Sequence, residues 1–333
     1  MPRIAPSSPL IRWIVAMLAA LGPMAGQSSE PVIAIHGGAG TILRENMTPA
    51  LEAEYHAALG SALEAGYGRL ARGEPALDAI TAAITLLEDS PLFNAGRGAV
   101  YTWEGSHELD ASIMDGATGR AGAVGGVRGV RNPIVLARRV MDASPHVFLA
   151  GPGAEDFARE QDIVFAPDAW FHTDRRREQW EAMRKRNQAA SGPMLIGTVG
   201  AVALDTAGNL AAGTSTGGMT GKRWGRLGDS PVIGAGTWAR NDGCAVSATG
   251  HGEYFIRLGI AHEIYARVRI GGESVEAAAS GVIHGALEET GGTGGVIVLD
   301  PDGRVAMPFN TQGMYRGVMR AAGEARTAIY AEP

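Results

Sequence analysis

The sequence carries little charge of either sign and almost no cysteine. Only 19% of its 333 residues are charged, and the net charge at pH 7 is -6. Without an excess of lysine and arginine there is no extended cationic surface for a phosphate backbone, so no nucleic-acid partner is expected. Cys244 is the single cysteine, which excludes an intrachain disulfide. The 45% hydrophobic content is enough for one large domain.

The sequence also lacks an apolar run that could span a membrane. The run Trp13 to Leu21 has about nine apolar residues, too few to cross a hydrocarbon core of roughly 30 Å as a helix. Arg3 and Arg12 precede it, and small residues follow it up to Gly26. This order is typical of a secretory signal peptide over residues 1–26. We therefore expect a periplasmic protein with no membrane partner after signal removal.

Apolar periodicity predicts strands and helices before residue 171. Val32 to Ile35 is a β-branched run, which indicates a buried strand entering a tight glycine loop at His36 to Gly40. Helices are predicted over residues 50–71, 76–87, 133–141 and 154–160, and short extended segments over residues 99–102 and 121–127.

A charged segment then divides the chain. Residues 171–191 are rich in arginine and acidic residues and end in Ala-Ala-Ser-Gly-Pro, which predicts a solvated helix and a flexible linker. Beyond it, the patterns predict hairpins over residues 198–214 and 295–307, and helices over residues 253–270 and 274–288. Because both halves supply strands, we expect one domain of packed sheets with helices on both outer faces.

Hydroxyl groups and glycine loops recur after the linker. Gly197-Thr198 opens this part, and Thr216 and Thr249 each precede a glycine. Glycine lets backbone N–H groups approach a reacting centre at which a neighbouring hydroxyl also points. Arg226 could pair a substrate carboxylate and Asp229 an ammonium group; alternatively, the two form a surface ion pair. The set suits acyl transfer on a small zwitterion.

Six short motifs are distributed over residues 33–330. They are His36-Gly37-Gly38-Ala39-Gly40, Phe93-Asn94-Ala95-Gly96, His107-Glu108-Leu109-Asp110, Ile113-Met114-Asp115-Gly116, Gly197-Thr198-Val199-Gly200-Ala201 and Pro308-Phe309-Asn310-Thr311. Together they resemble the plant-type or bacterial-type isoaspartyl peptidases/asparaginases, which are N-terminal nucleophile hydrolases. The resemblance implies an α+β fold, a four-layer αββα sandwich, whose precursor cuts itself between Gly197 and Thr198. The products would be an α chain of residues 27–197, with its linker at about 171–197, and a β chain of residues 198–333, assembled as a dimer of cleaved αβ units.

The resemblance also implies roles for individual residues. Thr198 would be the nucleophile, Thr216 its supporting hydroxyl, Asn94 a neighbour, and Thr249 with Gly250 the oxyanion hole. The implied substrate pocket comprises Arg226, Leu227, Gly228, Asp229, Thr249, Gly250, His251 and Gly252. No cofactor is implied for catalysis, but main-chain carbonyls at Leu87, Glu88, Ser90, Phe93, Ala95 and Arg97 would bind a structural sodium ion. His251 stands where the family often has a small or hydroxylated residue, and we expect its side chain to face solvent.

The chemistry of an N-terminal threonine supports this interpretation. A free α-amino group has a pKa of about 7.7–8.0 and can act as the base for its own hydroxyl near neutral pH. In an intact chain the same nitrogen is an amide, so cleavage before Thr198 creates the base. The small Gly197 leaves room for the attack.

The expected activity is hydrolysis of β-aspartyl dipeptides and L-asparagine to release L-aspartate. The sequence does not rank these two substrates. Glycosylasparaginase is the nearest alternative, although Gly197 and Gly218 stand where that branch typically has Asp and Asn. A catalytically inactive periplasmic amino-acid-binding protein is an alternative from another class. A serine hydrolase is disfavoured because glycines, not a helix, follow the G-x-S-x-G match around Ser215. A metallohydrolase is disfavoured because Ala266 occupies the second histidine position of the pattern that begins at His262.

Overall fold

The computed structural model describes residues 29–185 and 197–331. The predicted signal peptide and residues 186–196 of the predicted linker lie outside these ranges, so the signal peptide and the flexibility of the linker stay predictions. Within the ranges, none of the helices combines the length and the apolar character needed to cross a bilayer.

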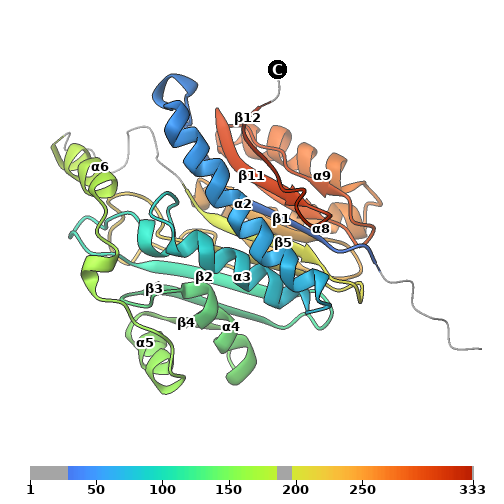
Figure 1. Cartoon of the computed structure of the whole chain (residues 1–333), viewed down its shortest axis with the longest axis horizontal. Helices are drawn as coiled ribbons and strands as arrows, with labels where there is room; N and C mark the ends of the chain where they lie inside the picture. The colour runs from blue at the N-terminus through green and yellow to red at the C-terminus, as the bar shows by residue number, and fades with distance from the viewer. Residues whose placement is uncertain (1–28, 186–196, 332–333) are drawn as a thin grey trace, which may run out of the picture.

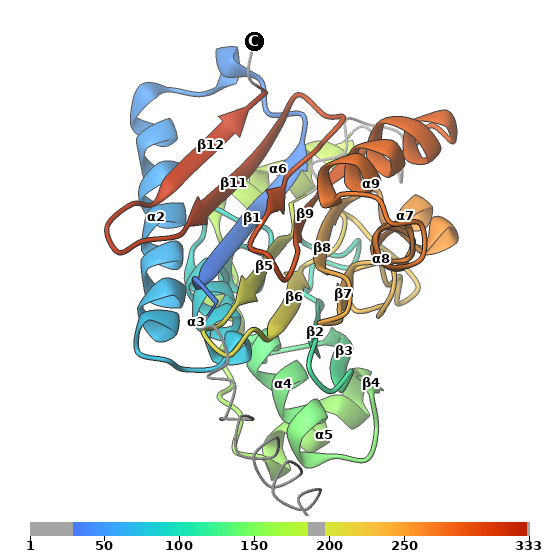
Figure 2. The same ribbon diagram turned by 90° about the vertical axis from the view of Figure 1, so that its right-hand side faces the viewer.

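Two sheets form the centre of the molecule (Figures 1 and 2). The larger has the order β12-β11-β1-β5-β6-β2-β3-β4, and the smaller has the order β10-β9-β8-β7. The larger sheet contains β1 (Val32–Gly40), β2 (Leu109–Asp115), β3 (Ala121–Val127), β4 (Phe148–Ala150), β5 (Val199–Leu204), β6 (Leu210–Thr216), β11 (Gly313–Met319) and β12 (Arg326–Tyr330). The smaller contains β7 (Thr237–Ala239), β8 (Ala245–Gly250), β9 (Gly294–Leu299) and β10 (Val305–Ala306). All pairings between these strands are antiparallel except that of β3 with β4.

Helices flank both sheets. The α-helices are α2 (Pro49–Ala71), α3 (Ala76–Asp89), α4 (Pro133–Ala143), α5 (Gly151–Glu160), α6 (Asp174–Lys185), α7 (Gly252–Leu258), α8 (Ile260–Arg269) and α9 (Val275–Gly281), and a π-helix continues α9 over Val282–Leu287. Short 3-10 turns occur at Arg44–Asn46, Gly96–Gly98 and Asp168–Trp170. Helices α2 and α3 lie across one face of the larger sheet, and α8 and α9 lie beside the smaller sheet (Figure 2).

Side-chain alternation along the strands divides the core into three clusters. In β1, Ile33 and Ile35 pack with residues of α2 and α3, whereas Val32 and Ala34 pack with Ile297 and other residues of the smaller sheet. A third cluster joins the other face of the smaller sheet to α7, α8 and α9. Each sheet is therefore apolar on both faces, as expected when both are covered. The prediction of packed sheets with outer helices is confirmed as a mixed α and β fold.

Local sequence signals explain the predicted elements that are present. Helix α2 begins where Thr48 accepts a hydrogen bond from the Leu51 amide and Pro49 occupies the first turn. The β5–β6 hairpin turns at Asp205, whose carboxylate accepts from the amides of Ala207 and Asn209. Both signals lie within a few residues of the element that they specify.

Several predicted boundaries are wrong. The glycine-rich segment His36 to Gly40 is not a loop but the second half of β1, with a bulge between His36 and Gly38. Glycine is needed there because a side chain on Gly38, whose φ is +111°, would lie 2.7 Å from the Cα atom of Gly197. Residues 99–102 form no strand. The helix predicted over residues 253–270 is broken at Gly259, which has the left-handed φ of +57°.

The predicted solvated helix is α6, but it is not solvated on every side. Arg176 is buried, and its Nε donates to the Gly98 carbonyl at 2.7 Å. The sequence patterns do not predict the strands β2, β4, β7, β8, β11 and β12. Strand β2 carries Asp110 and Ser112 at buried positions, so its apolar pattern is interrupted.

Candidate active site

A cavity lies where β5 begins and β6 ends. Its lining residues are Thr198, Thr216, Gly218, Met219, Arg226, Gly228, Asp229, Ser230 and Gly250. The antiparallel register of β5 and β6 pairs Val199 with Ser215, which brings the adjacent Thr198 and Thr216 together. Six residues that the sequence singled out thus share one cavity, although they span 53 positions of the chain.

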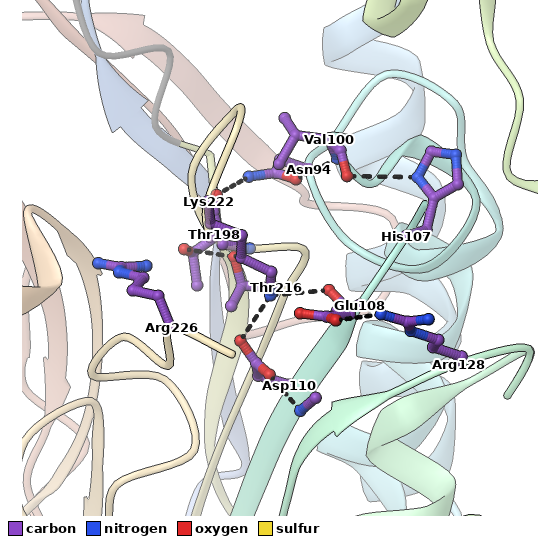
Figure 3. Close-up of polar contacts among 12 residues, drawn as sticks. Asn94, Val100, His107, Glu108, Asp110, Arg128, Thr198, Thr216, Lys222 and Arg226 are labelled. Carbon is purple, nitrogen blue, oxygen red and sulfur yellow. Dashed lines mark hydrogen bonds and ion pairs between the residues drawn. The ribbon is translucent and has the colours of Figure 1, made fainter. Parts of the chain in front are cut away.

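The hydroxyl groups of two threonines form a short chain at the centre of this cavity. Thr198 is buried, and its hydroxyl donates to Thr216 Oγ1 at 3.1 Å, as Figure 3 shows. The Thr216 hydroxyl lies 3.4 Å from the carbonyl oxygen of Gly197 and accepts from the Gly218 amide at 3.0 Å. The Thr198 hydroxyl is therefore held next to the peptide bond that precedes it.

A buried histidine fixes the backbone of Thr198. His36 Nδ1 lies 3.0 Å from the Thr198 carbonyl oxygen, and its Nε2 lies 2.9 Å from Ser247 Oγ. Burial lowers the pKa of His36 to about 3, so the ring is neutral at pH 7. Because a carbonyl only accepts, Nδ1 carries the proton and Nε2 accepts from Ser247. Sequence reasoning placed His36 in a motif but gave it no role.

The end of β8 supplies two further polar groups. Gly250 lines the cavity, and Thr249 precedes it in the strand. The Ala39 amide donates to Thr249 Oγ1 at 3.2 Å. This contact occupies a lone pair of Thr249 and leaves its hydroxyl proton available. Gly250 thus shares a cavity with Thr198, whereas Thr249 is not among the residues that line it and is held by the end of β1.

Asn94 lies next to Gly197, the residue that precedes Thr198. A side chain on Gly197 would lie 3.1 Å from Asn94 Cβ. The Asn94 amide group donates to the Gly218 carbonyl at 2.7 Å, and its oxygen accepts from the Val100 amide at 2.9 Å. Asn94 therefore connects the turn after β6 to the loop after α3.

Arg226 and Asp229 do not form the ion pair that was one interpretation of their spacing. Arg226 instead donates from Nε and Nη2 to the two carboxylate oxygens of Glu253, at 2.9 and 2.8 Å. Asp229 is buried, and its Oδ2 has no hydrogen-bond partner in the described part of the chain. Burial raises the pKa of Asp229 to about 7. The cavity therefore contains a carboxylate oxygen ready to accept a hydrogen bond.

The other predicted pocket residues are arranged around Arg226 and Asp229. A side chain on Gly252 would lie 2.9 Å from Arg226 Nη2 and from the Asp229 amide nitrogen. Leu227 points elsewhere, toward Gly125 of β3. The expectation that His251 faces solvent is wrong in part, because its side chain is only 28% exposed and its Nε2 lies 3.2 Å from Glu253 Oε2. Burial lowers the pKa of His251.

A buried ion pair lies beneath the turn after β6. Lys222 Nζ donates to the Glu108 carbonyl at 3.0 Å and lies 3.5 Å from Asp110 Oδ2 (Figure 3). Asp110 pairs with Thr216 across β2 and β6. The Lys222 side chain also packs against Gly218, whose φ is +81°. Sequence reasoning missed Lys222, and Asp110 appeared only within a motif.

Loop carbonyls are the groups here that suit a hard cation. Within the described ranges, no cluster of three or more His, Cys, Asp or Glu residues could hold a metal ion. A side chain on Gly96 would lie 2.5 Å from the Glu88 carbonyl oxygen, and one on Gly98 would collide with the carbonyl oxygens of Phe93 and Pro91. These contacts place carbonyl oxygens of Glu88, Pro91 and Phe93 against the glycines of the loop, and neutral carbonyl oxygens are ligands of the type that hard cations prefer.

Comparison with known proteins identifies the family of this chain. A family model described as Asparaginase (Asparaginase_2) matches residues 29–329. The chain belongs to the asparaginase family. It is 50% identical over 312 residues to an isoaspartyl peptidase of Salmonella typhimurium, across 91% of this chain and 100% of the relative. An isoaspartyl peptidase of Escherichia coli is 50% identical over 311 residues, across 91% and 97% of the two chains. A probable isoaspartyl peptidase/L-asparaginase 2 of Arabidopsis thaliana is 39% identical over 324 residues, across 90% and 98%.

This asparaginase-family chain is therefore a hydrolase, and its geometry argues against the two other hydrolase classes. Ser215 is buried within β6, and its hydroxyl donates to Glu88 at 2.6 Å, away from the cavity. No helix follows it, so it is not the nucleophile of a serine hydrolase. A metallohydrolase is also disfavoured. His262, at which the metal-binding pattern begins, packs edge-on against Trp238, and no metal-binding cluster is present among the described residues.

Proposed function

We propose that this protein is a self-cleaving threonine amidohydrolase that hydrolyses β-aspartyl dipeptides and L-asparagine to L-aspartate. The observation that carries the proposal is the Thr198–Thr216 hydroxyl pair in one cavity with Arg226 and the unpartnered carboxylate oxygen of Asp229. The names of the bacterial relatives, isoaspartyl peptidase, support the dipeptide substrate.

The first step is an attack of the Thr198 hydroxyl on the Gly197 carbonyl carbon. The bond from that carbon to the Thr198 nitrogen is replaced by a bond to Oγ1, and water then releases the Gly197 carboxylate. The contact of the Thr216 hydroxyl with the Gly197 carbonyl oxygen favours this attack, because the hydroxyl can donate to the oxygen as negative charge develops. The product is a free amine on Thr198.

The second step uses this amine as the base. It accepts the proton of the Thr198 hydroxyl, which attacks the β-carbonyl of the substrate. The Thr249 hydroxyl and the Gly250 amide would donate to the oxyanion. Departure of ammonia or of an amino acid leaves a β-aspartyl ester, and water releases L-aspartate and the free enzyme.

Two charged residues would hold the aspartyl group. Its ammonium group would bind Asp229 Oδ2, which favours the ionised form of this buried carboxyl. Its α-carboxylate would take the bidentate position on Arg226 that Glu253 occupies without substrate. His251 lies beside Glu253 and would follow it when Arg226 is released.

The assembly and location are also part of the proposal. We infer a four-layer αββα sandwich of the N-terminal nucleophile hydrolase type, because apolar clusters separate α2 and α3, the two sheets, and α7 to α9. The α chain would comprise residues 27–197 and the β chain residues 198–333, in a periplasmic dimer of cleaved αβ units. A sodium ion held by carbonyls of the 87–97 loop would stiffen the support of Asn94.

One experiment tests cleavage and turnover together. The purified protein should give two fragments, and the second should begin Thr198-Val199-Gly200-Ala201. Thr198→Ala should neither cleave nor hydrolyse, whereas Thr198→Ser should retain some of both activities. Ser215→Ala is the control, because Ser215 faces Glu88 and not the cavity. An active Thr198→Ala protein would overturn the proposal. Aspartyl-glucosamine assayed beside a β-aspartyl dipeptide separates the glycosylasparaginase alternative.

A further inference from the structure

A second cavity adjoins the peptide bond between Gly197 and Thr198. Gly197 and Asn94 line the second cavity, whereas Thr198 lines the cavity that contains Asp229. The two cavities therefore meet at the bond that the proposed self-cleavage breaks. The second one offers about 100 Å³ of free space and is open to solvent.

The walls of the second cavity are apolar and cationic. Apolar and aromatic lining residues include Ile42, Leu51, Tyr55, Leu92 and Phe93. The charged residues in its lining are Arg175 and Arg176 of α6, and no acidic residue lines it in the described part of the chain. This composition suits a ligand with an anionic group and an apolar side chain.

Neither arginine has a carboxylate partner among the described residues. Arg176 is buried and donates to the Gly98 carbonyl and to the Gln179 side-chain oxygen, both neutral acceptors. Burial lowers the pKa of Arg176 to about 10, so it keeps its charge at neutral pH. Arg175 donates to the Tyr55 hydroxyl. A buried cation with only neutral partners is unfavourable, and a bound anion would offset this cost.

We infer that the second cavity binds the leaving amino acid of a β-aspartyl dipeptide and that Arg175 and Arg176 receive its free carboxylate. The inference rests on the proposed function. Arg226 and Asp229 would hold the aspartyl part in the first cavity, so the leaving part extends away from it across the reacting carbonyl. The second cavity lies next to that position once the Gly197–Thr198 bond is cut. A planar guanidinium matches a carboxylate in bidentate geometry.

This assignment separates the two substrates that the sequence could not rank. The leaving group of asparagine is ammonia, which has no carboxylate and no side chain. Only a dipeptide can use Arg175, Arg176 and the apolar wall. The structure therefore assigns the second cavity to peptide hydrolysis rather than to asparagine hydrolysis.

The test uses the cleaved enzyme and three substrates: β-aspartyl-leucine, its C-terminal amide, and L-asparagine. A charge-assisted hydrogen bond contributes about 1.5–3 kcal/mol, so kcat/KM for the dipeptide should exceed that for the amide by about tenfold or more. In Arg175→Gln this ratio should fall several-fold, chiefly through KM, because only Arg176 remains to receive the carboxylate, and Arg175→Lys should restore part of it. The matched control is Arg177→Gln, because Arg177 is on the same helix but is exposed and pairs with Asp174.

Each outcome is informative. Equal losses in Arg175→Gln on all three substrates, or a wild-type enzyme that does not distinguish the dipeptide from its amide, would overturn the inference. The second result is also expected if the Gly197 carboxylate released by cleavage stays on the arginines. Both results leave the proposed function intact, since it is tested separately by the two fragments of the purified protein and by the loss of activity in Thr198→Ala.

Discussion

Arg226 is bound to Glu253 through two hydrogen bonds and forms none with Asp229, although Arg226 and Asp229 line the same cavity. Glu253 is about half exposed, whereas Asp229 is buried. The Arg226 guanidinium is therefore paired with the partly exposed carboxylate of Glu253, and the buried carboxylate of Asp229 is not paired with it. Under the proposed function, a substrate carboxylate that takes the Nε and Nη2 position on Arg226 displaces Glu253.

We expect Glu253→Gln to lower the KM for asparagine by up to about fivefold, because a partly exposed ion pair contributes about 0.2–1 kcal/mol and a neutral side chain competes less well for Arg226. Michaelis kinetics at low and high salt measure the effect. High salt should narrow the difference between the variant and the wild type. A higher KM in Glu253→Gln would instead mean that Glu253 positions Arg226 for substrate.

Arg226→Ala should lower kcat/KM for β-aspartyl dipeptides by roughly 10²- to 10³-fold, since two charge-assisted hydrogen bonds to the α-carboxylate are lost. Self-cleavage should persist, because the Gly197 carbonyl needs no such contact. Gel analysis of fragments and steady-state kinetics report the two activities. Arg223→Ala is the control, because Arg223 stacks over Trp103 at 3.5 Å from the ring centroid. Unchanged kinetics in Arg226→Ala would remove this residue from the pocket.

Thr249→Ala should lower kcat by roughly 10²- to 10³-fold, the usual loss for one oxyanion donor. Thr249→Ser keeps the hydroxyl and the contact with the Ala39 amide, so it should recover most of the rate. The comparison requires equal amounts of cleaved enzyme, measured from the fragment bands. If Thr249→Ser were as slow as Thr249→Ala, the methyl group and not the hydroxyl would be the important part.

Asp229→Asn should inactivate the enzyme yet stabilise it at high pH. Burial raises the pKa of Asp229 from 3.8 to about 7, so the folded state favours the protonated form. The stabilisation from this group is complete below pH 3.8 and is lost as the pH rises through about 7, by up to about 4 kcal/mol. Asparagine cannot ionise. The variant should therefore melt higher than the wild type at pH 9, and the difference should shrink toward pH 4. A difference that is independent of pH would contradict the assignment.

Lys222→Met should destabilise the fold by about 3–5 kcal/mol, the usual cost of leaving one member of a buried ion pair without its partner. Asp110, whose pKa is raised by burial and lowered by Lys222, would be left beneath the turn after β6 without its cationic partner. The double variant Lys222→Met/Asp110→Asn removes both charges and should recover much of the loss. Urea denaturation of the uncleaved Thr198→Ala background measures each step. Equal stability of Lys222→Met and the wild type would show that the Lys222–Asp110 pair contributes no net free energy to folding.

The sequence predicted those features whose signals are local. The β5–β6 hairpin was predictable because Asp205 and Asn209 lie in the turn itself. Strand β2 was not, because its partners determine it: Asp110 is buried there only because Lys222, 112 residues away, reaches it. The motifs likewise predicted residues that line the cavity. They did not predict that Arg226 binds Glu253, because that contact depends on the tertiary fold.

The strand order has a consequence for the cleaved protein. In the larger sheet β1 lies between β11 and β5, and β2 lies beside β6. Strands β1 and β2 precede the proposed cut, whereas β5, β6 and β11 follow it. In the larger sheet each fragment therefore supplies strands that fill gaps in the other, and neither contains that sheet complete, whereas the smaller sheet belongs wholly to the second fragment. The cut therefore increases the number of chains but leaves one folded unit. The native mass should stay constant during maturation. Fragments that are expressed separately should become structured only after they are mixed.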